Sequence, residues 1–143
     1  MSIVWPAFAL AALSFAVVIR LARQRFAAAY GGRVDPRYYK VFRGESDPEE
    51  VAATARNLSN LYEMPTLFYA GVAIAFAAGL SGTLLDSLAW AYVALRVLHT
   101  AIHLTSNKLR WRFRAFAASM FVLIAFLAAL GWQLAQGTPA AGA

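Results

Sequence analysis

The residues best suited to chemistry in this sequence are three polar side chains at the head of a long apolar run. Arg56, Asn60 and Glu63 are spaced i, i+4 and i+7, so they share one face of a helix. The run that follows, residues 66–80, is almost wholly apolar. An ionisable group at membrane depth is costly and usually faces a bundle interior or a wet cavity. This first polar set therefore indicates a functional site at the entrance of a membrane helix.

A second polar set stands on one face of the next predicted helix: Arg96, His99 and His103. Arg110 follows in the basic segment just beyond that helix. A helix rises about 1.5 Å per residue, so antiparallel neighbours joined near Gly79 would bring Glu63 level with Arg96. The remaining residues of the first set would then lie alongside His103. The two sets together predict a ladder of polar groups that leads into the bundle.

Such a ladder matches a small zwitterion with more than one carboxylate. Arginines hold carboxylates through paired N–H groups, and Glu63 would hold an ammonium group. Glutathione is one such molecule. Arg110 would stabilise its thiolate, because a nearby positive charge lowers the pKa of a thiol. The chain contains no cysteine, so any thiol must arrive with a ligand.

The composition indicates an integral membrane protein with a single domain, residues 1–143. Of the 143 residues, 61% are hydrophobic and only 14% are charged, which is too apolar for a soluble domain of this size. The net charge of +6 would also suit a nucleic-acid partner. The basic residues, however, flank apolar runs, as they do at the cytoplasmic ends of membrane helices. We therefore expect membrane lipid as a partner and no nucleic acid.

Four segments are predicted to cross the bilayer, a crossing that takes about 20 residues. They are residues 3–21, 48–79, 83–104 and 113–134. The expected fold class is all-α, an integral membrane four-helix bundle. Basic residues are concentrated after the first and third segments. The positive-inside rule then places both termini on the non-cytoplasmic side of a multi-pass protein, which we expect in a bacterial inner membrane.

The second segment carries the strongest local signals. Asp47 is predicted to cap this helix, with Pro48 at its first position and Glu50 completing a capping box. Pro65 is predicted to kink the helix, because proline removes a backbone hydrogen bond. A ridge of small residues follows, suited to close packing against another membrane helix: Gly71, Ala75 and Gly79.

Both polar sets resemble the motifs of the MAPEG family, which comprises the microsomal glutathione transferases and the leukotriene and prostaglandin E synthases. The family carries Arg-x3-Asn-x2-Glu at the cytoplasmic start of the second membrane helix, which here is Arg56, Asn60 and Glu63. It also carries Arg-x2-(Tyr/His)-x3-(Tyr/His) in the third helix and an arginine near the fourth, which here are Arg96, His99, His103 and Arg110. The resemblance covers essentially the whole chain and is to a bacterial-type branch.

The resemblance implies a homotrimer of four-helix protomers with glutathione bound between subunits. It implies that Arg110 stabilises the thiolate. The implied glutathione contacts are Arg56, Asn60, Glu63, Arg96, His99 and His103. The implied function is a glutathione transferase or peroxidase that acts on small lipophilic substrates, namely electrophiles that reach the site from the bilayer.

Structural interpretations of the same residues stay open. Arg56 and Arg110 would also suit the inner membrane interface as ordinary lipid-facing cations. Glu63 would suit an ion pair with Arg96, and Asn60 an interhelical hydrogen bond. The two histidines have the spacing of a zinc pair, but the sequence offers no third ligand, so no metal is predicted. The alternative function is a non-catalytic membrane protein of the same fold that binds a lipid-like ligand or has a structural role.

Overall fold

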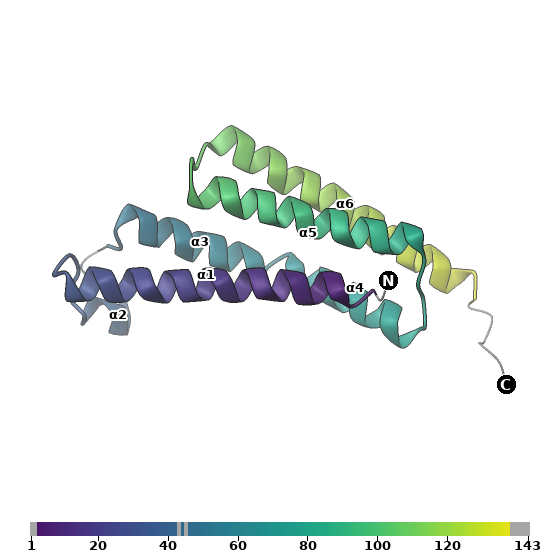
Figure 1. The fold of residues 1–143 in the computed structure, drawn as a ribbon, viewed down its shortest axis with the longest axis horizontal. Coiled ribbons are helices and arrows are strands. Elements are labelled where there is room, and N and C mark those ends of the chain that lie inside the picture. The colour runs from purple at the N-terminus through teal and green to yellow at the C-terminus, as the bar shows by residue number, and fades with distance from the viewer. Residues whose placement is uncertain (1–2, 43, 45, 138–143) are drawn as a thin grey trace.

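The computed structural model describes residues 3–42, 44 and 46–137, and within that part of the chain all regular structure is helical. The helices are α1 (Trp5–Tyr30), α2 (Tyr38–Val41), α3 (Glu49–Tyr62), α4 (Pro65–Ala77), α5 (Thr83–Leu104) and α6 (Leu109–Ala135). The long helices lie in two pairs, with α1 beside α3 and α4, and α5 beside α6 (Figure 1). The predicted all-α fold class is confirmed.

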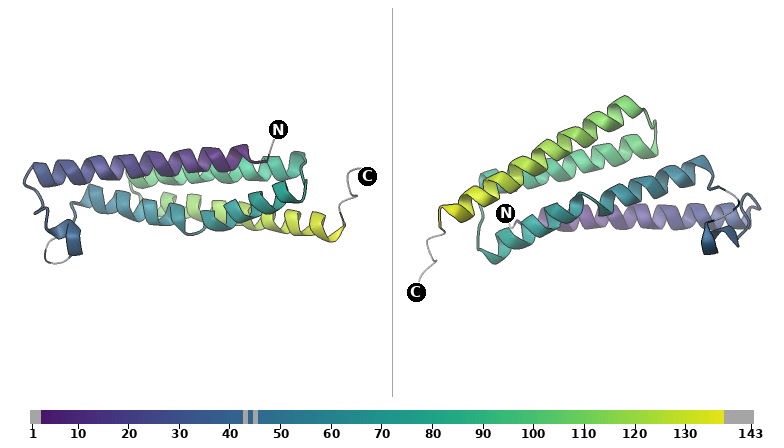
Figure 2. Two further views of the ribbon diagram at one scale, coloured as in Figure 1. Left: turned by 90° about the horizontal axis from the view of Figure 1, so that it is seen from below. Right: turned by 180° about the vertical axis from the view of Figure 1, so that it is seen from behind.

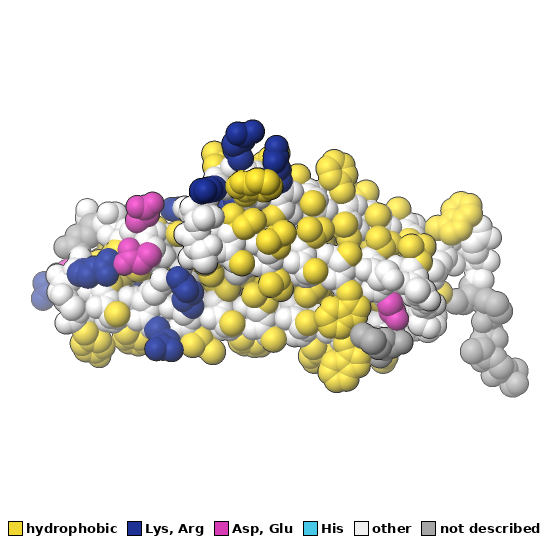
Figure 3. Space-filling model, turned by 45° about the horizontal axis from the view of Figure 1, so that its top comes forward, with side chains coloured by type: hydrophobic (Ala, Val, Ile, Leu, Met, Phe, Trp, Pro, Cys, Tyr) yellow, Lys and Arg dark blue, Asp and Glu magenta, His cyan; other side chains and the backbone are white. Residues whose placement is uncertain are grey.

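The ends of the helices separate into two chemically different regions. The start of α1, the end of α6 and the α4–α5 turn lie at one end of the molecule, and the two other connections lie at the opposite end (Figures 1 and 2). On the face drawn in Figure 3, Lys and Arg side chains gather towards that opposite end, and hydrophobic side chains are spread along the rest of the helices. The chain therefore has the grouping of termini and basic connections that the sequence predicts.

Among the described residues, α1 and α6 are long and apolar enough to cross a membrane, at 26 and 27 residues. Their outer faces carry large apolar side chains. Phe15 on α1 is 66% exposed and Phe121 on α6 is 74% exposed. Exposed aromatic and aliphatic side chains along a whole helix are typical of a lipid-facing surface.

The second predicted helix is broken in the middle. Helix α3 ends at Tyr62 and α4 begins at Pro65, and Glu63 between them has a ψ of −94°, outside the helical range. Pro65 has no N–H group to donate to the preceding turn, so the hydrogen-bond ladder stops there. The predicted kink is therefore a complete interruption, and Pro65 occupies the first turn of a new helix, where proline is well tolerated.

The predicted capping box at the start of α3 is wrong. Pro48 takes the N-cap position, and no side chain caps the helix. The carboxylate of Asp47 instead lies 3.9 Å from the guanidinium of Arg25 on α1. Glu50 forms an ion pair with Arg33, and this hydrogen bond lowers the pKa of the Glu50 carboxyl. The acidic side chains therefore tie the start of α3 to the end of α1, because cations there compete with the N–H groups of α3.

Close packing between α4 and α6 explains part of the predicted small-residue ridge. Gly71 lies against the ring of Phe126, so that an added Cβ would lie only 2.8 Å from a ring carbon. Ala75 is fully buried, as is Phe68, whose ring centre is 5.6 Å from that of Phe126. Gly79 has a φ of +65° and lies in the turn that follows α4. The ridge is therefore confirmed for its first two members, whereas the third serves the turn.

Candidate functional site

The second polar set is buried inside the helix packing. Arg96, His99 and His103 are 0%, 3% and 2% exposed, and the two imidazole rings lie 5.7 Å apart. Helix α5 carries all three and contacts α1, α3 and α6. The i, i+3, i+7 spacing places the three side chains on one face, as predicted. The structure therefore places the three side chains in the interior, where a polar group is costly unless a hydrogen bond or a ligand compensates for the lost water.

Arg96 binds the end of α3 at the break. Its guanidinium donates a hydrogen bond to the backbone carbonyl of Asn60. The last carbonyls of a helix lack intrahelical partners and carry its negative dipole end, so a cation is favourable there. Nε and Nη1 of Arg96 are buried without a hydrogen-bond partner among the described residues. The guanidinium lies 5.8 Å from the ring centre of Phe116 on α6. Arg96 therefore joins α3 and α5 and keeps donor capacity unused.

His103 is held by a residue that the sequence motif did not select. Asn57 on α3 is 0% exposed, and its side-chain nitrogen lies 3.2 Å from Nδ1 of His103. An amide nitrogen only donates, so Nδ1 of His103 is the acceptor of this hydrogen bond. The same nitrogen lies 3.4 Å from the Thr100 hydroxyl. Asn57 belongs to the stripe of buried positions along α3 that includes Val51 and Leu61. That periodicity was the sequence signal that would have identified it.

A groove of about 200 Å³ lies between α3, α5 and α6, and we call it the polar groove because three polar side chains line it beside three apolar ones. It is lined by Asn60, His99, Leu109, Arg112, Phe113 and Phe116. Nδ1 of His99 donates to the backbone carbonyl of Arg112 at 3.2 Å, which leaves Nε2 as an acceptor without a partner among the described residues. The Arg112 guanidinium donates to the side-chain oxygen of Asn107 at 2.8 Å. An amide, an imidazole and a guanidinium thus meet in one groove.

Three of the predicted site residues lie outside this interior cluster. Arg56, Glu63 and Arg110 are exposed on the surface of the single chain. Within the described residues Glu63 makes no salt bridge, and it is the carbonyl of Asn60 that meets Arg96. The ion pair of Glu63 with Arg96, one of the alternatives left open by the sequence, is therefore not formed among the described residues.

No group of three possible metal ligands is found in residues 3–42, 44 and 46–137. His99 and His103 are instead engaged with a carbonyl and an amide, each through Nδ1. The local chemistry is that of hydrogen bonding and of cation–anion recognition, and the arrangement is suited to an anionic or zwitterionic ligand.

The sequence was also compared with known proteins. The sequence model of the MAPEG family matches residues 3–132, which is nearly the whole chain. Both polar sets, the polar groove and Arg110 fall within the matched range. No curated protein and no solved structure matches the chain.

Proposed function

The chain belongs to the MAPEG family, and on that basis we propose that it is a glutathione-dependent membrane enzyme of the transferase or peroxidase type. It is a membrane protein, as the family and the apolar helices α1 and α6 indicate. The observation that carries the proposal is the polar groove, in which Asn60, His99 and Arg112 meet at the junction of three helices. Polar groups within membrane helices generally mark a ligand or ion pathway.

The binding mode follows from the charges around the groove. The carboxylates of glutathione bind the guanidinium groups of Arg56 and Arg112, and its amine binds Glu63. The side chain of Asn60 lines the groove and is available to the ligand, because Arg96 uses only its backbone carbonyl. The Arg96 guanidinium lies 5.8 Å from the ring centre of Phe116, one of the groove walls, and adds a positive potential there.

Two arginines near the start of α6 have different roles in this proposal. Arg110 has the spacing of the thiolate-stabilising arginine in the family motif, and we assign it that role. Arg112, which sequence reasoning passed over, lines the groove itself and holds the ligand. A cation beside the sulfur favours the thiolate, which is the nucleophilic form. The thiolate then forms a bond to an electrophilic carbon of a lipophilic substrate, and the leaving group departs with the bonding electrons.

Assembly completes the site in this proposal. Arg56 and Glu63 are exposed on the single chain beside the apolar helix α4, and contact with hydrocarbon would be costly for both. A neighbouring copy that covers them removes this cost. We infer a homotrimer of four-span protomers with both termini on the non-cytoplasmic side. The grouping of the basic connections at one end supports this orientation (Figure 3).

Thiolate formation tests the proposal. Glutathione is titrated into the purified protein in detergent at neutral pH, and the ultraviolet absorbance of the thiolate is followed. Wild-type protein is expected to give a saturable signal, and S-methylglutathione, which has no thiol, none. Glu63→Gln is expected to weaken binding, because the ligand amine loses its counter-charge. If glutathione neither binds nor ionises, the non-catalytic alternative replaces the enzyme.

A further inference from the structure

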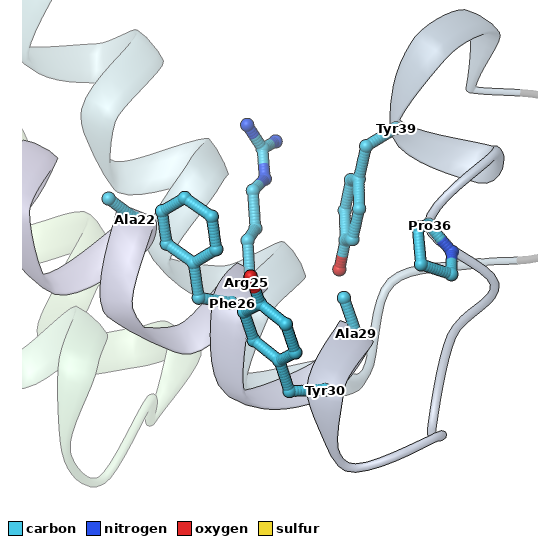
Figure 4. Close-up of a pocket in the computed structure, with 7 residues that line it drawn as sticks. All are labelled: Ala22, Arg25, Phe26, Ala29, Tyr30, Pro36 and Tyr39. Carbon is cyan, nitrogen blue, oxygen red and sulfur yellow. The ribbon is translucent and has the colours of Figure 1, made fainter.

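A separate pocket of about 380 Å³ lies at the basic end of the molecule, outside the polar groove. It is formed by the last turns of α1 and by the connection that carries α2. Phe26 and Tyr30 of α1 form one wall of the pocket, and Pro36 and Tyr39 form the other (Figure 4). The side chain of Arg25 extends between the two walls. We call this the interfacial pocket. Apart from Arg25 and the two phenol groups, its lining side chains are apolar.

The position of the interfacial pocket is at the boundary between lipid tails and headgroups. The apolar run of α1 ends at Leu21, and Arg23 and Arg25 follow it. Phe26 and Tyr30 are 62% and 88% exposed and stack on one another with ring centres 6.2 Å apart. Aromatic rings and arginines at the end of a membrane helix mark the headgroup level. The mouth of the pocket therefore opens where phosphate groups and the first methylene groups of lipids lie.

The guanidinium of Arg25 contacts two aromatic rings, and at least one of its N–H groups has no hydrogen-bond acceptor among the described residues. Its guanidinium lies 5.5 Å from the ring centre of Tyr39 and 5.2 Å from that of Phe42. Asp47 forms an ion pair with the guanidinium at 3.9 Å, a distance too long for a hydrogen bond, so the pair leaves hydrogen-bond donors of Arg25 unused. Nε of Arg25 is buried and has no partner among the described residues. A guanidinium oriented by aromatic stacking, with free N–H groups, is suited to bidentate binding of a phosphate.

We propose that the interfacial pocket binds one anionic phospholipid per chain. The phosphate accepts hydrogen bonds from Arg25, and the beginning of an acyl chain lies between the aromatic walls. The apolar lining favours a lipid over a free phosphate ion, since a free ion would leave that surface uncovered. Arg37 and Lys40 flank Tyr39 in the sequence and are exposed, which favours an anionic headgroup over a zwitterionic one. The proposal goes beyond the glutathione chemistry and does not depend on it.

The test is lipid retention measured by native mass spectrometry of the full chain in detergent. Phosphatidylglycerol and phosphatidylcholine with identical acyl chains are added separately, and glycerol phosphate is added as a probe of the headgroup alone. Wild-type protein is expected to retain one phosphatidylglycerol per chain, and neither of the other two probes. Arg25→Gln is expected to weaken retention about tenfold, the effect of losing one charge-assisted hydrogen bond.

Two further variants separate the site from general charge. Tyr39→Leu keeps Arg25 and Asp47 but removes one wall and one ring contact, and it is expected to weaken retention as well. Arg23→Gln removes an equal charge from the same helix at a position that does not line the pocket, and it is expected to retain phosphatidylglycerol as the wild type does. Equal retention by Arg25→Gln and wild type overturns the proposal. It is also overturned if glycerol phosphate binds as well as the lipid, or if Arg25→Gln changes the oligomeric state rather than lipid binding.

Discussion

The side-chain amide of Asn57 on α3 donates a hydrogen bond to Nδ1 of His103 on α5, across 3.2 Å. Both side chains are buried, at 0% and 2% exposure. The bond fixes the level of α3 against α5. The neighbouring polar residue of the motif, Asn60, contacts α5 through its backbone carbonyl instead. The two asparagines, three residues apart, therefore have different roles. The side chain of Asn57 holds α3 against α5, whereas that of Asn60 lines the polar groove.

Replacement of the two asparagines should separate these tasks. Asn57→Ala leaves Nδ1 of His103 buried without a donor, and we expect a loss of about 1–3 kcal/mol in unfolding free energy. Asn60→Ala keeps the carbonyl that Arg96 binds, so stability should change by less than about 0.5 kcal/mol. Glutathione affinity should fall in Asn60→Ala, because its side chain lines the groove. Denaturant unfolding and glutathione titration measure both effects, and equal destabilisation by the two variants would contradict the assignment.

The two arginines of α6 are expected to give different kinetic signatures. Arg110→Ala should keep glutathione binding but reduce the thiolate absorbance and turnover, since it removes an interaction with the developing anion. Arg112→Ala should weaken binding about tenfold, because a ligand carboxylate loses a charged partner. The backbone carbonyl of Arg112 that accepts from His99 remains in that variant. Arg114, whose guanidinium lies 5.0 Å from the Trp111 ring, is a matched control on the same helix. An unchanged thiolate signal in Arg110→Ala would remove Arg110 from the mechanism.

The close approach of α4 and α6 should make Gly71 sensitive to a single methyl group. In Gly71→Ala the new Cβ would lie 2.8 Å from Phe126 and 2.9 Å from Leu127. Such overpacking costs about 1–3 kcal/mol, and the midpoint of thermal unfolding should fall. Gly131→Ala on α6 is the control, since a Cβ there meets nothing within 4 Å. It should be neutral or stabilising by up to about 1 kcal/mol, because alanine favours helix more than glycine does. The prediction fails if Gly71→Ala and Gly131→Ala have the same midpoint of thermal unfolding.

The ion pair between Arg33 and Glu50 should make the stability pH-dependent at acidic pH. The hydrogen bond from Arg33 lowers the folded-state pKa of Glu50 below its ordinary value of 4.5. A lowered folded pKa means that the contribution is present above the ordinary value and is lost as the pH falls through the folded value. Glu50→Gln should therefore unfold at a slightly lower temperature than wild type at pH 7. The difference should shrink in more acidic buffer, and a constant difference between pH 7 and acidic pH would contradict the prediction.

The sequence could predict those helix boundaries that are determined by residues close to them in the chain. Helix α1 ends at Tyr30, just before the glycine pair at 31 and 32, and α5 covers the predicted residues 83–104. These boundaries depend on nearby residues. The start of α3 was wrong because Asp47 lies beside Arg25, from a different helix, instead of capping its own. The choice between two partners far apart in the sequence is decided by tertiary packing, which local patterns do not contain.

The same reason limits what the sequence revealed of the candidate site. The spacing of Arg96, His99 and His103 correctly placed them on one face, because that face lies within one unbroken helix. The choice between Asn57 and Asn60, and between Arg110 and Arg112, depends on how a helix is rotated towards its neighbour. Helix α3 turns the first asparagine inwards, and α6 turns Arg112 towards the groove. The roles of Arg56 and Glu63 stay predictions, because both lie on the outer surface of the single chain.

The interruption after α3 divides the second predicted membrane helix into two separate helices, α3 and α4. The hydrogen-bond ladder of α3 closes at the N–H of Glu63, and that of α4 opens at the N–H of Thr66. A tilt of α3 is therefore not carried into α4 as it would be along a rigid rod. Gly71 anchors α4 firmly to α6, while α3 is joined to α5 through Arg96 and Asn57. Helix α3 therefore takes its position from its bonds to α5 and from the ion pairs with Arg25 and Arg33, and not from continuity with α4.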